Sequence, residues 1–211
     1  MASHPIPQLL RLAVEKPELL EGSAADLGHL EVGALIGCYD DLFPRLEPLM
    51  WAAGDEDFSR WLATYQALFR EQQALIDAHG GMIQARFIIA IPIADRPDHL
   101  RLCLESILQL CLCYEYGGRG PDGLFKRVSV VVAEDSRDVI NRERHRALVA
   151  DFRRRGLDAH HFGLEAQYES LMAIPAAQRR ELAGLLTDQP AAAFHHKGQA
   201  ATRNLSYLKM V

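Results

Sequence analysis

Phe87-Ile88-Ile89-Ala90-Ile91 and Val128-Ser129-Val130-Val131-Val132-Ala133 are the two stretches that decide the fold. Both are apolar, rich in β-branched residues and too short for a helix, so each predicts a buried strand. A weaker third strand is predicted near residues 158–162. Helices are predicted over about 98–112 and 139–155, between the strands. Strands that alternate with helices are typical of parallel βαβ units, so the sequence predicts an α/β fold with a parallel, doubly wound sheet.

The chain before these strands has the pattern of a separate helical region. An apolar stripe at helical spacing follows Gly54 and predicts a helix that stops at Gly80-Gly81. Weaker patterns predict helices over about 6–14, 24–38 and 41–52, and two more near 177–186 and 198–209 after the strands. We therefore divide the chain into a helical N-terminal region, residues 1–80, and an α/β region, residues 81–211. The stripe consists of Phe58, Trp61, Leu62, Tyr65, Leu68, Phe69, Leu75 and Ile76.

Composition and charge narrow the classes of function. Of the 211 residues, 49% are hydrophobic and 24% charged, which is ordinary for a globular protein. No apolar run approaches the roughly 18 residues of a membrane span, and Met1–Pro5 lacks the layout of a signal peptide, so we expect a cytoplasmic protein without a membrane span. Residues 1–80 carry a net charge of −8 and residues 81–211 carry +3. This asymmetry is compatible with an anionic ligand but is too weak to indicate nucleic acid.

Polar residues follow both strands, where ligands bind in open α/β sheets. The first strand leads into Pro92-Ile93-Ala94-Asp95-Arg96-Pro97, and the second into Glu134-Asp135-Ser136-Arg137-Asp138. Neither is a glycine-rich phosphate loop, so a dinucleotide site and a P-loop lose their main support. Carboxylates here suit the N–H of a base or the hydroxyl of a ribose. The same residues also suit the capping of the next helix, and both interpretations stay open.

The C-terminal segment favours the ligand-binding interpretation. It reads His195-His196-Lys197-Gly198-Gln199-Ala200-Ala201-Thr202-Arg203-Asn204-Leu205. Its small residues let the start of a helix approach a neighbouring element closely. Arg203 offers a forked cationic donor that suits a base carbonyl or a phosphate. The adjacent histidines are not a ready chelate on a strand, although His196 is a candidate to lie near a phosphate.

Taken in order along about 87–208, these motifs resemble glycosyltransferase family 2, which has the GT-A fold. Pro92 to Arg96 resembles the turn after the family's first strand. The helix that begins Leu100-Arg101-Leu102-Cys103 resembles its L-x-x-C-L-x-S-I helix, and Glu134 to Asp138 its Asp-Asp-x-Ser-x-Asp turn. Lys197-Gly198 to Arg203-Asn204 resembles its K-G-x-x-x-A-R-N segment, with Thr202 in the alanine position.

The resemblance implies a binding site for a nucleotide-sugar, with UDP or GDP as the nucleotide. Pro92, Ile93 and Ala94 would line the nucleoside pocket, with Ala94 where the family often has a stacking tyrosine. Asp135 would accept the N–H of the base, with Glu134 as the alternative because the turn aligns ambiguously by one residue. Arg203 would reach the base or the diphosphate. The other nucleotide-binding candidates are Asp95, Arg96, Lys197 and Gly198.

The family also implies Mn²⁺ or Mg²⁺, held by an Asp-x-Asp motif after the Arg-Asn helix. No Asp-x-Asp follows Asn204 in this sequence, and Asp55-Glu56-Asp57 lies before the first strand, at a helix start. The cysteines form no CxxC pair, so no residue here supports a metal site. We expect a donor-binding half that stops before the metal motif, inactive as it stands, with an unknown acceptor. The exposed edge of a half sheet also predicts self-association into a homo-oligomer.

Two other hypotheses remain. One is a non-catalytic nucleotide-binding or protein-interaction module that keeps the half-fold, with the helical region as its working surface. The other is an unrelated flavodoxin-like α/β domain whose motif matches arise by chance. The absence of a cleft at the ends of the first two strands would favour the last hypothesis.

Overall fold

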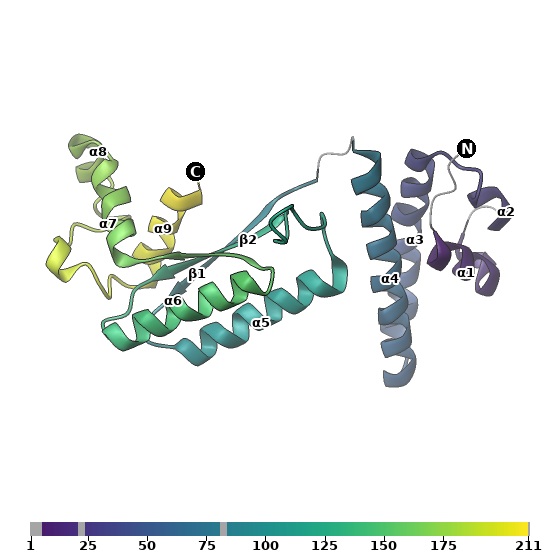
Figure 1. The fold of residues 1–211 in the computed structure, drawn as a ribbon, viewed down its shortest axis with the longest axis horizontal. Helices are drawn as coiled ribbons and strands as arrows, with labels where there is room; N and C mark the ends of the chain where they lie inside the picture. Colours follow the sequence, from purple (N-terminus) through teal and green to yellow (C-terminus); the bar gives the residue numbers. More distant parts are fainter. Residues whose placement is uncertain (1–5, 21–23, 81–83, 211) are drawn as a thin grey trace. The chain divides into compact units, whose positions relative to one another are not determined.

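A computed structural model of the chain describes residues 6–20, 24–80 and 84–210. The Gly81 of the expected boundary, and the Met1–Pro5 stretch, lie outside the described residues. Contacts within the chain divide it into two compact units, which are described separately (Figure 1). The first unit runs to Gln84 and also includes Leu112–Gly118, and the second consists of Ala85–Cys111 and Arg119 onward. The segment Leu112–Gly118 therefore packs with the helical region rather than with the sheet.

The first unit is helical, with two long helices, α3 and α4, packed against each other (Figure 1). The sequence predicted two helices here, over about 24–38 and 41–52. In the structure the short α2 ends at Leu27, and α3 is one continuous helix through residue 40, so the break between the two helices lies before α3. Asp40 and Asp41 are exposed while Tyr39 and Leu42 beside them are buried, so the acidic pair belongs to the outer face of one helix. The elements are α1 (Pro7–Glu15), η1 (Pro17–Leu19), α2 (Ala24–Leu27), α3 (Val32–Ala52) and α4 (Asp55–His79).

A buried carboxylate ties three helices of the first unit together. Glu71 on α4 accepts the backbone N–H groups of Gln8 and Leu9 at 2.9 Å each, and so caps the start of α1. It also accepts the hydroxyl of Tyr39 on α3 at 2.7 Å. The apolar stripe predicted on α4 supplies part of the core around this network, with Leu68 and Leu75 buried. The stripe is therefore a core face within this unit.

The second unit is built on a three-stranded parallel sheet in the order β1-β2-β3, which confirms the α/β class predicted from the two apolar stretches. β2 is central, and its Val130 pairs with Ile89 on β1 and with Ala159 on β3. The first elements are β1 (Phe87–Ile93), α5 (Pro97–Tyr114), β2 (Val128–Glu134), α6 (Val139–Arg154) and β3 (Asp158–Phe162). The helices α5 and α6 begin and end close to the predicted bounds.

Four further elements follow β3. They are α7 (Leu164–Ala173), α8 (Ala176–Glu181), η2 (Ala191–Ala193) and α9 (Gln199–Met210). The helix expected near 177–186 is the shorter α8, whereas α7 had no counterpart in the sequence pattern. Much of α7 is exposed, and only Gln167 and Leu171 are buried, so it has no continuous apolar stripe to reveal it. Among the described residues, no helix is long and apolar enough to cross a bilayer.

The two faces of the sheet are covered by different helices (Figure 1). Val130 and Val132 of β2 point to the face covered by α5 and α6, where they join Leu104 and Phe152 in one core. Successive residues of a strand point to opposite faces, so Val131 lies on the other side. The α9 helix packs against β1, β2 and α7, and Asp135 at the end of β2 accepts the N–H groups of Lys197 and Gly198 just before it. The carboxyl ends of β1 and β2 therefore lie beside the start of α9.

Candidate functional site

A cavity of about 550 Å³ opens at the carboxyl ends of β1 and β2, beside the first turn of α9. Three separate sequence motifs meet in its lining: the turn after β1, the turn after β2 and the start of the C-terminal helix. Such a position is where open α/β sheets bind ligands. The lining residues are Pro92, Ile93, Ala94, Asp95, Arg96, His99, Asp135, His196, Gly198, Gln199 and Thr202.

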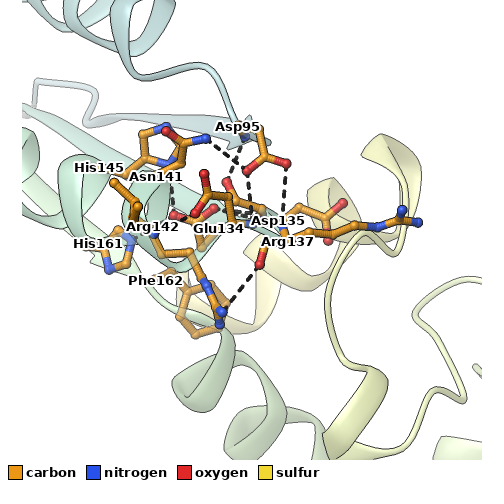
Figure 2. Close-up of polar contacts among 12 residues, drawn as sticks. Asp95, Glu134, Asp135, Arg137, Asn141, Arg142, His145, His161 and Phe162 are labelled. Atoms are coloured by element: carbon orange, nitrogen blue, oxygen red, sulfur yellow. Dashed lines mark hydrogen bonds and ion pairs between the residues drawn. The ribbon is translucent and has the colours of Figure 1, made fainter.

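Asp95 joins the two turns that form one wall of this cavity (Figure 2). Its backbone has a positive φ of 51°, and its N–H donates to the hydroxyl of Ser136 at 2.7 Å. Its carboxylate accepts the N–H groups of Arg137 and Asp138 at 3.4 and 3.2 Å, and the amide of Asn141 at 3.3 Å. Burial opposes its ionisation, but these hydrogen bonds outweigh it and lower the pKa of Asp95 below the ordinary value.

Asp135 fastens the C-terminal segment to the end of β2. Its Oδ1 accepts the N–H of Lys197 at 2.8 Å, and its Oδ2 accepts the N–H of Gly198 at 3.1 Å. Its backbone carbonyl accepts the N–H of His196 at 3.0 Å. His196 and Gly198 have φ values of +52° and +94°, and Gly198 is the residue type that adopts such a φ without strain. These bonds set where α9 begins.

The side chain of Lys197 also contacts Asp135, from the interior of the protein. Its side chain is fully buried, with Nζ 3.0 Å from Oδ1 of Asp135 and 4.4 Å from the ring centre of Phe194. Burial lowers the pKa of Lys197, while the pairing with Asp135 opposes that shift. Lys197 is therefore a partner of Asp135 and not part of the cavity lining.

Glu134 lies on the opposite side of the strand end, in a buried cluster with two histidines (Figure 2). Its Oε2 is 2.9 Å from Nδ1 of His145 and 3.3 Å from Nε2 of His161, and its Oε1 accepts the N–H groups of Asp135 and Ser136. Burial alone would raise the pKa of Glu134, but the hydrogen bonds from the histidines and Ser136 lower it far below 4.5.

The structure thus brings together most of the residues predicted for the site and leaves three outside the lining. Pro92 through Arg96, Asp135 and Gly198 line the cavity. Glu134 and Lys197 are buried behind it. Arg203 is exposed on α9 and is not part of the lining. Of the two carboxylates that the turn left ambiguous, Asp135 is the one that reaches the cavity.

Four lining residues were not predicted as site residues from the sequence: His99, His196, Gln199 and Thr202. Gln199 and Thr202 are three residues apart on α9, so the helical period placed them on one face with Gly198. His99 lies in the first turn of α5, and its closeness in sequence to Asp95 and Arg96 was a usable signal. His196 was noted only as a residue that lies near a phosphate.

A cavity of similar size, about 560 Å³, lies in the first unit between α1 and α4. Its charged residues are engaged with neighbours: Arg11 pairs with Glu15, and Arg60 with Asp57. None of the polar motifs that follow the strands lines it, and from the apolar stripe only Trp61 is in its lining, so we place the candidate site in the second unit. Within the described part of the chain, no group of three or more histidine, cysteine or acidic side chains has a metal-binding arrangement.

Comparisons with known proteins leave the site to be interpreted from its own chemistry. No protein-family model, no curated protein and no solved structure matches this chain.

Proposed function

We propose that the cleft at the ends of β1 and β2 binds the nucleotide part of a UDP- or GDP-sugar. The supporting observation is the convergence of three motifs, far apart in the sequence, on one cavity of about 550 Å³. A volume of this order suits a small-molecule ligand. On this proposal the three-stranded sheet is the donor-binding part of a GT-A-like, doubly wound sheet.

The residues divide into contact residues and positioning residues. Pro92, Ile93 and Ala94 form an apolar wall suited to the faces of a base and a ribose. Asp135 holds α9 in place and lines the cavity with a side chain that is 6% exposed. One of its acceptor positions, on Oδ2, is left for a base N–H after the bond from Gly198. Transfer of the sugar to an acceptor is the reaction that the family resemblance implies.

Calorimetric titration of the whole chain with UDP, GDP and ADP tests this proposal, with Mn²⁺ present and again in EDTA. We expect one of the nucleotides to bind. Ala94→Trp, which places a large ring in the cavity, should weaken binding by about tenfold or more, since one such ring removes most of the contact wall. Ala150→Trp is the matched control, because Ala150 is exposed on α6 away from the cleft. A folded sample that binds none of the nucleotides in either buffer would refute the proposal.

The variant Arg203→Ala distinguishes the prediction of the sequence resemblance from that of the cleft geometry. The sequence resemblance assigns Arg203 to the base or the diphosphate, which predicts a loss of affinity. The cleft geometry places Arg203 outside the lining and predicts unchanged affinity. Unchanged nucleotide binding in this variant, together with loss in Ala94→Trp, is the outcome expected from the structure.

A further inference from the structure

The cleft carries three side chains that hold or can take up positive charge: Arg96, His99 and His196. Arg96 and His99 come from the segment between β1 and the first turn of α5, and His196 comes from the segment before α9. Within residues 6–20, 24–80 and 84–210, none of these three side chains makes a hydrogen bond or an ion pair. These side chains are therefore available to a ligand in the cavity.

The two carboxylates in the lining are already engaged. Asp135 pairs with Lys197 and accepts two backbone N–H groups, and Asp95 accepts two N–H groups and the amide of Asn141. Each oxygen of these two carboxylates already accepts a hydrogen bond, and among the described residues no third acidic side chain lines the cavity, so the lining lacks the set of unengaged carboxylates that Mn²⁺ or Mg²⁺ takes as ligands. The residues described at this cleft therefore do not fit the divalent cation that the family resemblance implies, but they do fit an anion.

The first turn of α9 adds to this charge distribution. The N–H groups of Lys197 and Gly198 are taken by Asp135, whereas those of Gln199, Ala200 and Ala201 have no partner among the described residues. Gln199 lines the cavity. Free N–H groups at the start of a helix of 12 residues favour an anion near that helix end, and Gln199 places this end at the cavity.

We propose that Arg96, together with His99 and His196, binds the phosphate groups of the nucleotide directly, so that a nucleoside diphosphate binds this chain without a divalent cation. The inference rests on the proposed function and names the part of the cleft that holds the phosphates. On this inference, cationic side chains of the protein take the place of the metal ion that the family resemblance implies.

The test is calorimetry on the whole chain with the nucleoside diphosphate that binds best, its parent nucleoside and inorganic pyrophosphate. In EDTA the diphosphate should bind about as tightly as in Mn²⁺, pyrophosphate should compete with it, and the nucleoside should bind about tenfold more weakly or worse. Arg96→Gln removes a charge-assisted contact and should weaken diphosphate binding about tenfold, leaving nucleoside binding unchanged. Arg137→Gln, an exposed arginine of the next turn outside the lining, is the matched control.

The outcomes separate this inference from the proposed function. Binding in Mn²⁺ that is abolished by EDTA would overturn the metal-free assignment and leave the nucleotide site standing. Unchanged diphosphate affinity in Arg96→Gln would overturn the assignment of the phosphates to this residue. Absence of nucleotide binding in both buffers would overturn the proposed function itself. A urea-unfolding midpoint for each variant shows that it is folded.

Discussion

The end of β2 shows how the alternation of a strand separates two adjacent carboxylates. Glu134 points to the face covered by α6 and meets His145, whereas Asp135 points to the opposite face and meets Lys197. Both side chains are almost fully buried; Glu134 is hydrogen-bonded to His145, and Asp135 is paired with Lys197. Removal of one partner leaves the other buried without its counterpart, and this costs more than breaking an exposed ion pair.

Replacement of Asp135 by asparagine should lower the free energy of unfolding by about 3 kcal/mol, because it leaves the buried Lys197 without its counter-charge. Urea unfolding measures this change. Asp151→Asn, which breaks an exposed pair with Arg154, should cost less than about 1 kcal/mol. The double variant Asp135→Asn with Lys197→Met should lose less than the two single changes summed. Equal costs for Asp135→Asn and Asp151→Asn would contradict this account.

Glu134 should make stability depend on acid pH. The folded state lowers the pKa of this carboxyl, so its contribution is fully present above the ordinary value of 4.5 and is lost as pH falls below it. Glu134→Gln should therefore cost about 2 kcal/mol or more at pH 7, and the gap to the original protein should narrow between pH 5 and pH 3. Urea midpoints across this range measure the gap, and a gap that does not change with pH would be the contrary result.

At the scale of elements, tight connections decide where helices stop and strands begin. The connection from α6 to β3 passes through Gly156, which has a φ of +105° and whose carbonyl accepts the N–H of Phe125. The guanidinium of Arg119 lies over the ring of Phe125 at 4.0 Å and fills the space beside Gly156. A side chain at this position meets both an unfavourable backbone conformation and an occupied space.

Gly156→Ala should lower the free energy of unfolding by about 2 kcal/mol, because an added Cβ would lie 3.3 Å from the carbonyl oxygen of Gly123 and collide with Arg119. Gly184→Ala is the matched control, since no atom lies within 4 Å of its added Cβ. The control should be neutral or slightly stabilising. Thermal unfolding of both variants compares them, and equal melting temperatures would refute the prediction.

At the scale of the whole molecule, the two units are not two continuous pieces of chain. The end of α5 and the loop after it, Leu112–Gly118, belong by contact to the helical unit. Tyr114 packs edge-on against Phe69 with ring centres 5.3 Å apart. The N–H of Gly117 donates to Gln73 at 3.1 Å. The helical unit therefore depends on residues that follow β1 in the sequence.

Tyr114→Ala should destabilise the helical unit by about 2 kcal/mol, because it removes a half-buried ring from the side of α4. Hydrogen exchange followed by mass spectrometry should show faster exchange in α4. Tyr207→Ala, which removes a tyrosine that is 60% exposed on α9, is the control and should leave α4 unchanged. Unaltered exchange of α4 in Tyr114→Ala would show that the segment is not part of this unit.

The sequence by itself determined the strands, the parallel α/β class and the turns around the cleft. These features depend on local patterns: apolar runs of β-branched residues, helical periodicity and polar residues directly after a strand. It also selected most of the cavity lining, because residues that follow neighbouring parallel strands must meet at one edge of the sheet.

Only the tertiary structure decided how each side chain is used. It buried Glu134 with two histidines, engaged Asp135 with Lys197, left Arg203 outside the lining and assigned Leu112–Gly118 to the helical unit. A motif gives the residue type and its place along the chain. Burial, direction and partners depend on elements that are distant in the sequence, such as α6 and the segment before α9, and on the face of a strand or helix that each side chain occupies.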